Sequence, residues 1–381
     1  MRDIKFNVQT PVFVGENCVK KNGKQLLAFG RKAFLITSNF GAYRNYALED
    51  MQEVLTSLKI EYIVCCKAEE NPPVESCAAI AEAVCAYQPD FLVALGGGAA
   101  LDTAKAVDVL LAHPDEDPYA VFYGKNDAPH TTVFSEGKLP LIACPTTAGT
   151  GSEVTGYACL TRADTDTKLA MYQNVFCALA FLDPRYIREA PKELLHTGAL
   201  DALCHSVESY VNVKSNVMNR AMGEVGMKMF ASFKDHMLAD TLTDEDFYNM
   251  LIASYFDGMS FYQSGTCLPH GMSYPLSHHK NVLHGLACAV FEGEYLRAFK
   301  DQSIVEPVVK LCGFESLDAF CDYMQKIVSA DVKMSCTRTE VERWATDFAK
   351  IKSRLERHPE PITLEEIKEI HFKALAPYIV D

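Results

Sequence analysis

Two residues with metal-binding chemistry lie four positions apart in a mainly apolar stretch, Asp201 and His205. Leu200, Leu203 and Val207 fall at i, i+3 and i+7, which predicts a helix with one apolar stripe. On such a helix the carboxylate and the imidazole point the same way. Burying both is costly unless a partner satisfies them. A hydrogen-bonded pair inside a core would satisfy them, and so would a divalent metal ion.

A second stretch favours the metal ion over the bonded pair. Four of the eleven histidines fall within fifteen positions, and the first and last of them, His270 and His284, are each followed by glycine. Together with the first pair they offer one carboxylate and three imidazoles, a ligand set that suits Fe(II) or Zn(II). Cys204, Cys267 and Cys288 lie close in sequence and could capture zinc, although small buried thiols are also common core fillers.

Two further motifs complete the pattern. Residues 96–105 begin with three glycines, and residues 145–155 are rich in threonine, serine and glycine. In this order and spacing, the two runs, the aspartate and the histidines resemble the iron-containing (group III) alcohol dehydrogenases over nearly the whole chain. Three motifs in the order and spacing of the family identify it more specifically than any one of them would. The resemblance implies the metal ligands Asp201, His205, His270 and His284.

Strands alternate with helices in the first half of the chain. The apolar runs that predict buried strands are 32–38, 62–66, 91–95 and 139–144. Helices are predicted between them over 47–58 and 74–86. This alternation predicts an α/β dinucleotide-binding domain over residues 1–183, in which a parallel sheet has helices on both faces. Ligands then bind beyond the carboxyl ends of the strands.

Gly97 and Gly98 follow the third predicted strand and precede a helix. Glycines let the backbone approach a pyrophosphate, and a helix N-terminus offers free N–H groups; a simple tight turn is the alternative. The run is not the G-x-G-x-x-G fingerprint. The resemblance implies phosphate contacts from both glycines and from Ala99, where the family usually has serine. Asp102, where the helix begins, is also expected at the cofactor.

The resemblance assigns further cofactor contacts, although a solvated loop is the alternative for the threonine-rich run. These contacts are Thr146, Thr147 and Thr150 at the phosphates and nicotinamide, Lys168 at the ribose and Asn71 near the adenosine. Asn39 stands where NAD-preferring members often have aspartate, whose carboxylate repels a 2′-phosphate. Asparagine lacks that charge, so NADP stays open and NAD is favoured.

Helical periodicity dominates the second half of the chain. The predicted helices are 219–233, 244–263, 316–329, 340–354 and 364–375. Thr363 and Glu366 have the spacing of a capping box at the start of the last one. We expect an all-helical metal-binding catalytic domain over residues 184–381, with the boundary region at 183–191.

Composition narrows the possible partners of the protein. A net charge of −14 over 381 residues argues against nucleic acid, which needs a basic face. No apolar run approaches eighteen residues and the N-terminus has no signal-peptide pattern, so we expect a cytoplasmic protein with no membrane association and mostly reduced cysteines. The resemblance implies a homodimer.

Tyr274 stands where many family members carry a further histidine near the reacting carbon. Its phenol can donate a hydrogen bond or relay a proton, so it is the candidate catalytic residue. The string Ser-Tyr-Pro-Leu around it resembles a branch acting on small anionic aldehydes such as sulfoacetaldehyde or phosphonoacetaldehyde. The expected function is an NAD(P)- and metal-dependent alcohol dehydrogenase that reduces a small aldehyde. An uncharged short-chain aldehyde, or a non-catalytic metal- or nucleotide-binding role, is the alternative.

Overall fold

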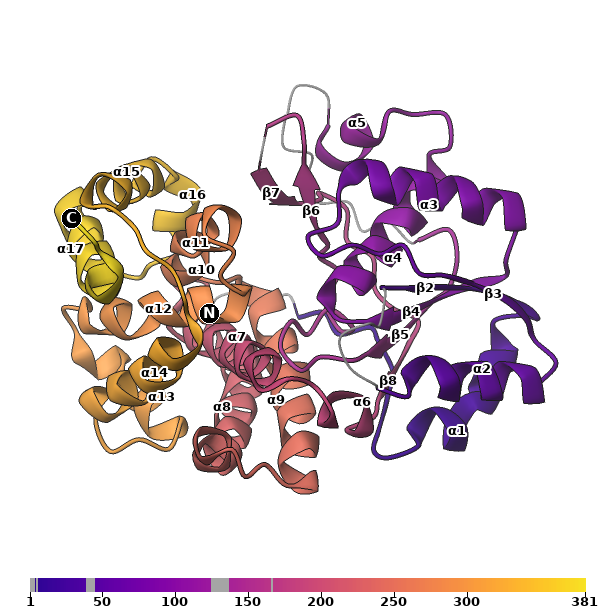
Figure 1. Ribbon diagram of the computed structural model, residues 1–381, viewed down its shortest axis with the longest axis horizontal. Helices are drawn as coiled ribbons and strands as arrows, with labels where there is room; N and C mark the ends of the chain where they lie inside the picture. Colours follow the sequence, from indigo (N-terminus) through magenta and orange to yellow (C-terminus); the bar gives the residue numbers. More distant parts are fainter. Residues whose placement is uncertain (1–3, 5, 39–44, 125–136, 166) are drawn as a thin grey trace. The chain divides into compact units, whose positions relative to one another are not determined.

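The computed structural model describes residues 4, 6–38, 45–124, 137–165 and 167–381 (Figure 1). They form two compact units, one spanning Val8–Pro191 and the other Lys192–Asp381 with the segment before Val8. The predicted boundary followed residue 183, eight residues before the division between the units. The intervening helix α6 (Arg185–Arg188) groups with the first unit, where Arg185 pairs with Asp50 of that unit.

Within the described residues, six parallel strands form the sheet of the first unit in the order β1-β8-β5-β4-β2-β3. They are β1 (Val12–Val14), β2 (Lys32–Thr37), β3 (Glu61–Cys65), β4 (Phe91–Gly96), β5 (Leu141–Pro145) and β8 (Leu179–Leu182). Every residue of β4 and β5 is buried, because helices cover both faces of a parallel sheet. The register pairs Gly96 with Pro145, so the loops after these two strands begin side by side.

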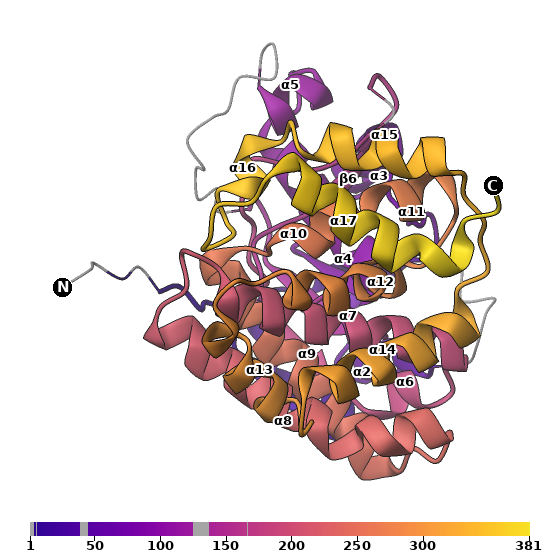
Figure 2. The same cartoon turned by 90° about the vertical axis from the view of Figure 1, so that its left-hand side faces the viewer.

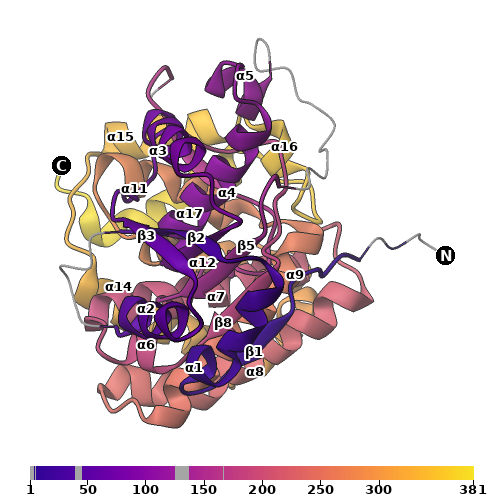
Figure 3. The ribbon, with the colours of Figure 1, turned by 90° about the vertical axis from the view of Figure 1, so that its right-hand side faces the viewer.

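The helices of this unit lie on both faces of the sheet, as predicted (Figures 1 and 3). Besides α6, they are α1 (Cys18–Asn22), the 3₁₀ helix η1 (Gly23–Ala28), α2 (Ala47–Ser57), α3 (Val74–Tyr87), α4 (Gly98–Ala112) and α5 (Pro118–Tyr123). In both views α3 and α4 lie on one face and α1 and α2 on the other. An antiparallel hairpin of β6 (Cys159–Arg162) and β7 (Thr167–Ala170) is separate from the sheet.

The second unit is built from helices, as predicted (Figure 2). They are α7 (Lys192–Val211), α8 (Val217–Ala239), α9 (Asp244–Ser264), α10 (Leu268–Met272), α11 (Tyr274–His279), α12 (His284–Arg297), η3 (Gln302–Ile304), α13 (Glu306–Leu311), α14 (Leu317–Asp331), α15 (Arg338–Phe348), α16 (Lys352–Leu355), α17 (Leu364–Leu375) and η4 (Ala376–Tyr378). Helix α7 packs against α8, α9, α10 and α12, and α15 lies beside α17 (Figure 2).

Two local predictions for this unit have different outcomes. The capping box at Thr363 and Glu366 is confirmed, since each side chain bonds the backbone N–H of the other. The single helix predicted over 340–354 is wrong. The chain leaves the helical conformation at Ile351 (φ −84°, ψ 77°), and the short helix α16 begins after it. In the described part of the chain, no helix has the length and apolar character needed to cross a membrane.

Candidate functional site

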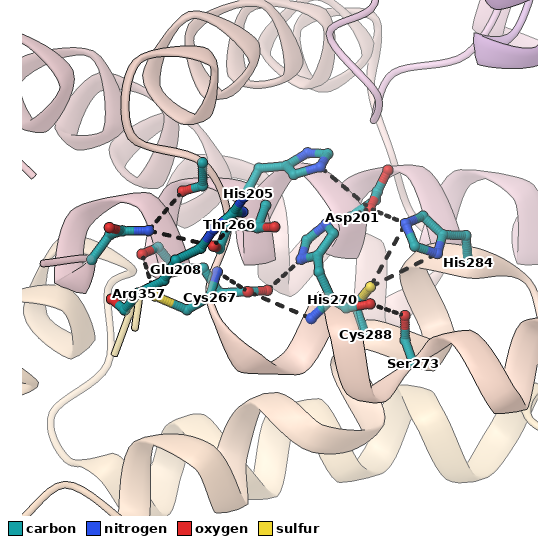
Figure 4. A network of polar contacts seen from close by, with 12 residues as sticks. Asp201, His205, Glu208, Thr266, Cys267, His270, Ser273, His284, Cys288 and Arg357 are labelled. Atoms are coloured by element: carbon teal, nitrogen blue, oxygen red, sulfur yellow. Dashed lines mark hydrogen bonds and ion pairs between the residues drawn. The ribbon is translucent and has the colours of Figure 1, made fainter. Parts of the chain in front are cut away.

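Helix α7 carries the central carboxylate of the site, that of Asp201. Its Oδ1 lies 3.5 Å from Nε2 of His270 on α10, 3.8 Å from Nε2 of His284 on α12 and 3.9 Å from Nε2 of His205 on α7 (Figure 4). Three helices therefore bring three of the predicted metal ligands, the imidazoles, around a carboxylate oxygen of the fourth. Asp201, His205 and His270 are buried, and His284 is half-buried.

Oδ1 of Asp201 and Nε2 of His270 face each other at this point, 3.5 Å apart, with no hydrogen bond between them. Among the described residues, neither Oδ1 of Asp201 nor Nε2 of His270 has a hydrogen-bond partner, and both residues are at least nine-tenths buried. Burial opposes ionisation of Asp201, but the imidazoles of His205 and His284 outweigh it and hold the pKa of this carboxyl well below its usual range. A buried carboxylate facing a ring nitrogen calls for a cation between them.

Four ligand atoms lie within 4.8 Å of one another, and they belong to Asp201, His270, His284 and Cys288. The fourth predicted ligand, His205, borders this group. Its ring stacks on Phe261 at 4.1 Å between centroids and on His270 at 4.5 Å. The structure thus brings three predicted ligands together with a cysteine thiol and places His205 next to them.

Sequence reasoning missed a second carboxylate, that of Glu208 on α7, which is fully buried. Its Oε1 bonds Nδ1 of His270, and its Oε2 accepts from the backbone N–H of Cys267 at 2.6 Å (Figure 4). A carboxylate on Nδ1 places the proton there and leaves Nε2 as the lone-pair donor toward Asp201. Its position seven residues after Asp201, on the same helix face, was the available signal.

Gly285 explains why glycine follows the ligand His284. A Cβ on Gly285 would lie 1.9 Å from the carbonyl oxygen of Thr197 and 2.7 Å from Cβ of Asp201. The first turn of α12 therefore lies directly against α7 at the level of the metal ligands. The Thr197 hydroxyl also accepts from the backbone N–H of Leu286 at 3.2 Å, which fixes this contact.

Tyr274, the predicted catalytic residue, lies beside the ligand group. Its ring is nearly parallel to that of His284, with centroids 6.3 Å apart. Its hydroxyl accepts a 2.8 Å hydrogen bond from Nη2 of Arg354 on α16, whose Nη1 donates to the hydroxyl of Thr266 at 3.1 Å. Arg354 was not predicted, because eighty residues separate it from Tyr274 and no motif links them.

The glycine and threonine loops of the α/β unit lie against each other. A Cβ on Gly97 would lie 3.2 Å from Thr147, and one on Gly98 would lie 2.7 Å from Thr150. The backbone N–H of Thr146 donates to the carbonyl oxygen of Gly96 at 2.9 Å. Helix α4 begins at Gly98, earlier than the sequence suggested, and includes Ala99 in its first turn. The glycine loop and the threonine-rich loop therefore meet at the N-terminus of α4, where free backbone N–H groups can bind a phosphate.

The remaining predicted cofactor residues fall into three groups. Lys168 donates to the Asn71 side-chain oxygen at 3.0 Å, so these two lie together. Asp102 has a structural role. Its carboxylate accepts hydrogen bonds from the Ser152 hydroxyl and the Cys159 N–H, each at 2.9 Å, and so holds the threonine-rich loop in place. Asn39 lies outside the described residues.

A buried lysine, also missed from the sequence, anchors the threonine-rich loop. Nζ of Lys105 donates to the carbonyl oxygens of Ser152, Thr155 and Tyr157 at 2.6–2.8 Å and to the Ser152 hydroxyl at 2.9 Å. Desolvation lowers the pKa of Lys105, while Asp102 opposes that shift. The lysine and Asp102 together fix the loop that faces the glycines. Its position one turn after Asp102 on α4 was the available signal.

Comparison with known proteins agrees with this geometry. Choline dehydrogenase of Bacillus subtilis (strain 168) is 29% identical over 291 residues, covering 76% of this chain and 71% of that protein. The solved iron-containing alcohol dehydrogenase of Thermotoga maritima is 30% identical, covers 98% of this chain and 100% of its own, and has a TM-score of 0.85. A sulfoacetaldehyde reductase of Bifidobacterium kashiwanohense, solved in complex with NAD+, is 22% identical with a TM-score of 0.83, covering 98% and 99% of the two chains.

Two family models match consecutive parts of the sequence. The model described as iron-containing alcohol dehydrogenase matches residues 9–184, and the model described as Fe-containing alcohol dehydrogenase family, C-terminal, matches residues 195–375. Each match falls within one of the two units. The chain therefore belongs to the iron-containing alcohol dehydrogenase family.

Proposed function

We propose that the protein is an NAD- and metal-dependent alcohol dehydrogenase that works as a reductase of small aldehydes. The observation that carries the proposal is a pair of buried atoms, Asp201 Oδ1 and His270 Nε2, that have no hydrogen-bond partner in the described part of the chain and lie beside two more imidazoles. Fe(II) and Zn(II) both accept this ligand chemistry. When bound, the ion polarises a carbonyl oxygen and the nicotinamide supplies the hydride.

The metal would be held by the predicted ligands Asp201, His205, His270 and His284. Glu208 keeps Nδ1 of His270 protonated, so that Nε2 carries the lone pair that binds the ion. Gly285 lets His284 approach Asp201 closely. These residues supply orientation and charge, which is the protein's share of catalysis by a bound ion and cofactor.

For the cofactor we propose a site at the N-terminus of α4. Gly97 and Gly98 leave room for the pyrophosphate, while Thr147 and Thr150 offer hydroxyls beside them. Lys168 and Asn71, which bond each other, would contact the ribose and adenosine. NAD is favoured, since the solved sulfoacetaldehyde reductase of the same fold contains NAD+. NADP is the alternative, because no carboxylate stands at position 39 to repel a 2′-phosphate.

For the substrate we propose a small aldehyde carrying an anionic group. Arg354 places a guanidinium 2.8 Å from the Tyr274 hydroxyl, and guanidinium groups bind sulfonate and phosphonate oxygens well. Tyr274 accepts from Arg354 and so keeps its own O–H to donate to the substrate. Two relatives named above are named for substrates of opposite charge, choline and sulfoacetaldehyde. The charge of the side chains at the substrate site therefore decides between them.

The test is NADH oxidation by metal-stripped protein supplied with Fe(II) or Zn(II), over sulfoacetaldehyde, phosphonoacetaldehyde and butyraldehyde. We expect the anionic aldehydes to give the higher kcat/KM. Arg354→Gln should lower that value by about 10- to 100-fold for sulfoacetaldehyde, because a charged hydrogen bond is lost, and leave butyraldehyde little changed. Arg354→Lys should recover part of the loss.

Three results would decide against parts of the proposal. Best turnover on butyraldehyde would reject the anionic substrate and leave an uncharged short-chain aldehyde. Oxidation of choline in preference to reduction of any aldehyde would show that the substrate is a cation and not an anion. Absence of NADH oxidation across the panel with either ion would favour a non-catalytic metal- or nucleotide-binding protein. We also propose that the protein is a homodimer, as the family resemblance implies, and light scattering of the purified chain tests this.

A further inference from the structure

Cys288 lies on α12 one turn after His284. Residues four apart on a helix share a face, so the thiol and the imidazole point the same way. Cys288 Sγ lies 3.9 Å from Nε2 and 4.0 Å from Nδ1 of His284, as Figure 4 shows. Helix α7 presents Asp201 and His205 with the same spacing. Each of two adjoining helices therefore brings a pair of donor groups to the same place.

The surroundings of this thiol differ from those of a core filler. Cys288 is fully buried, and its sulfur is within 4.8 Å of donor atoms from Asp201, His270 and His284. Two of those atoms, Asp201 Oδ1 and His270 Nε2, have no hydrogen-bond partner among the described residues. The sulfur thus completes a set of four oxygen, nitrogen and sulfur donors, two of which make no hydrogen bond within the described residues.

The spacing of the set is close to that of a tetrahedral ion. Zinc–nitrogen and zinc–oxygen bonds of about 2.0–2.2 Å and zinc–sulfur bonds of about 2.3 Å place neighbouring donors roughly 3.3–3.8 Å apart. Asp201 Oδ1 lies 3.5 Å from His270 Nε2 and 3.8 Å from His284 Nε2. The separation from Cys288 Sγ to His284 Nε2 is 3.9 Å. These three separations are within a few tenths of an ångström of the tetrahedral values, and the other three lie within 4.8 Å.

We propose that the Cys288 thiolate is a direct ligand of the divalent ion, so that the site prefers zinc to iron. The inference rests on the proposed function, because it concerns the same ion. On binding, the thiol gives up its proton to solvent and a metal–sulfur bond forms, with no change of oxidation state. Cys288 then takes the fourth position, which the family resemblance gives to His205, and His205 lies beside the set, stacked on Phe261. Thiolate ligands favour zinc, and carboxylate and imidazole alone do not discriminate as strongly.

The experiment replaces the ion with Co(II) in the full-length, metal-stripped protein and records its absorption. A cobalt–thiolate bond gives an intense charge-transfer band in the near ultraviolet, which cobalt bound by oxygen and nitrogen lacks. We expect this band in the wild type at one cobalt per chain and its absence in Cys288→Ser. The zinc affinity of Cys288→Ser should fall by more than about tenfold, and this loss should be larger than the loss of iron affinity in the same variant.

Cys204→Ser is the matched control, because Cys204 is also a fully buried thiol on a helix that carries ligands but lies outside the four-membered set. It should keep both the band and the zinc affinity. One bound cobalt without the band in the wild type, or an unchanged band in Cys288→Ser, would overturn the proposal while leaving the metal site intact. Failure of the wild type to bind cobalt at all would overturn the proposed function along with it.

Discussion

Replacing Gly285 with alanine tests the packing that forms the metal site. The added Cβ would lie 1.9 Å from the carbonyl oxygen of Thr197 and 2.8 Å from the backbone nitrogen of Asp201. Both of these atoms belong to the backbone of α7, so neither can turn away as the end of a side chain would. The first turn of α12 must therefore move away from α7, and it carries His284 with it.

The size of the effect follows from that distance. Restoring even 3.0 Å between the new Cβ and the Thr197 oxygen requires a displacement of about 1.1 Å. Overpacking of this kind costs about 1–3 kcal/mol of folding free energy. The metal site is more sensitive, because ligand distances must hold to about 0.2 Å. We expect zinc affinity and turnover to fall by about 100-fold or more, as for other ångström-scale misplacements.

The assay is zinc titration of metal-stripped Gly285→Ala protein, followed by aldehyde reduction at saturating metal. Gly293→Ala is the control, since Gly293 lies on the same helix and the nearest atom to its added Cβ would be the side-chain sulfur of Cys321 at 3.0 Å, with the backbone no closer than 3.7 Å. The control should bind zinc as the wild type does. Wild-type zinc affinity in Gly285→Ala would refute the claim that this glycine sets the distance between the ligand helices.

Three further predictions concern other parts of the molecule. Glu208→Gln should lower metal affinity by about 10- to 100-fold, measured by competition with a chelator, because the bond that orients His270 is weakened; an unchanged affinity would remove Glu208 from the site. Gly98→Val should weaken NADH binding, measured by fluorescence titration, without altering metal content, since its side chain would fill the space beside Thr150; equal loss of both would indicate misfolding instead. Burial raises the pKa of Asp108 to about 7 from an ordinary value of 3.8, so the folded state binds this proton more tightly than the unfolded state. The stability that the protonated group contributes below about pH 4 is therefore lost as pH rises toward 7, and Asp108→Asn should flatten the fall of melting temperature over that range; identical slopes for variant and wild type would contradict this.

The fold was predictable where residue patterns are long and regular. The runs at β2, β3, β4 and β5 are uniformly apolar or nearly so, and alternate with helical segments, which is typical of a parallel sheet. Strands β1 and β8 were missed because three or four residues carry too little pattern. Helix α7 begins at Lys192 and continues through Gly198, although glycine is a poor helix former. Packing of α12 against that glycine-containing turn overrides its weak helix propensity.

The site was predictable only where its residues share a short motif. Asp201 and His205 are four apart on one helix, and the family resemblance supplied His270 and His284. Cys288 has the same four-residue spacing from His284, but a thiol in an apolar helix is usually a core filler, so its place in the donor set needed coordinates. Partners joined only through tertiary structure, such as Arg354 at Tyr274, leave no trace in local sequence.

The most direct test of the account is the metal content of His270→Ala after stripping and reloading with zinc or iron, measured by mass spectrometry beside the wild type. We expect one ion per wild-type chain and almost none in the variant, with loss of aldehyde reduction in parallel. His270 lies at the centre of the donor set and has no other hydrogen-bond partner at Nε2 among the described residues. A fully loaded and fully active His270→Ala protein would show that these side chains do not form the metal site.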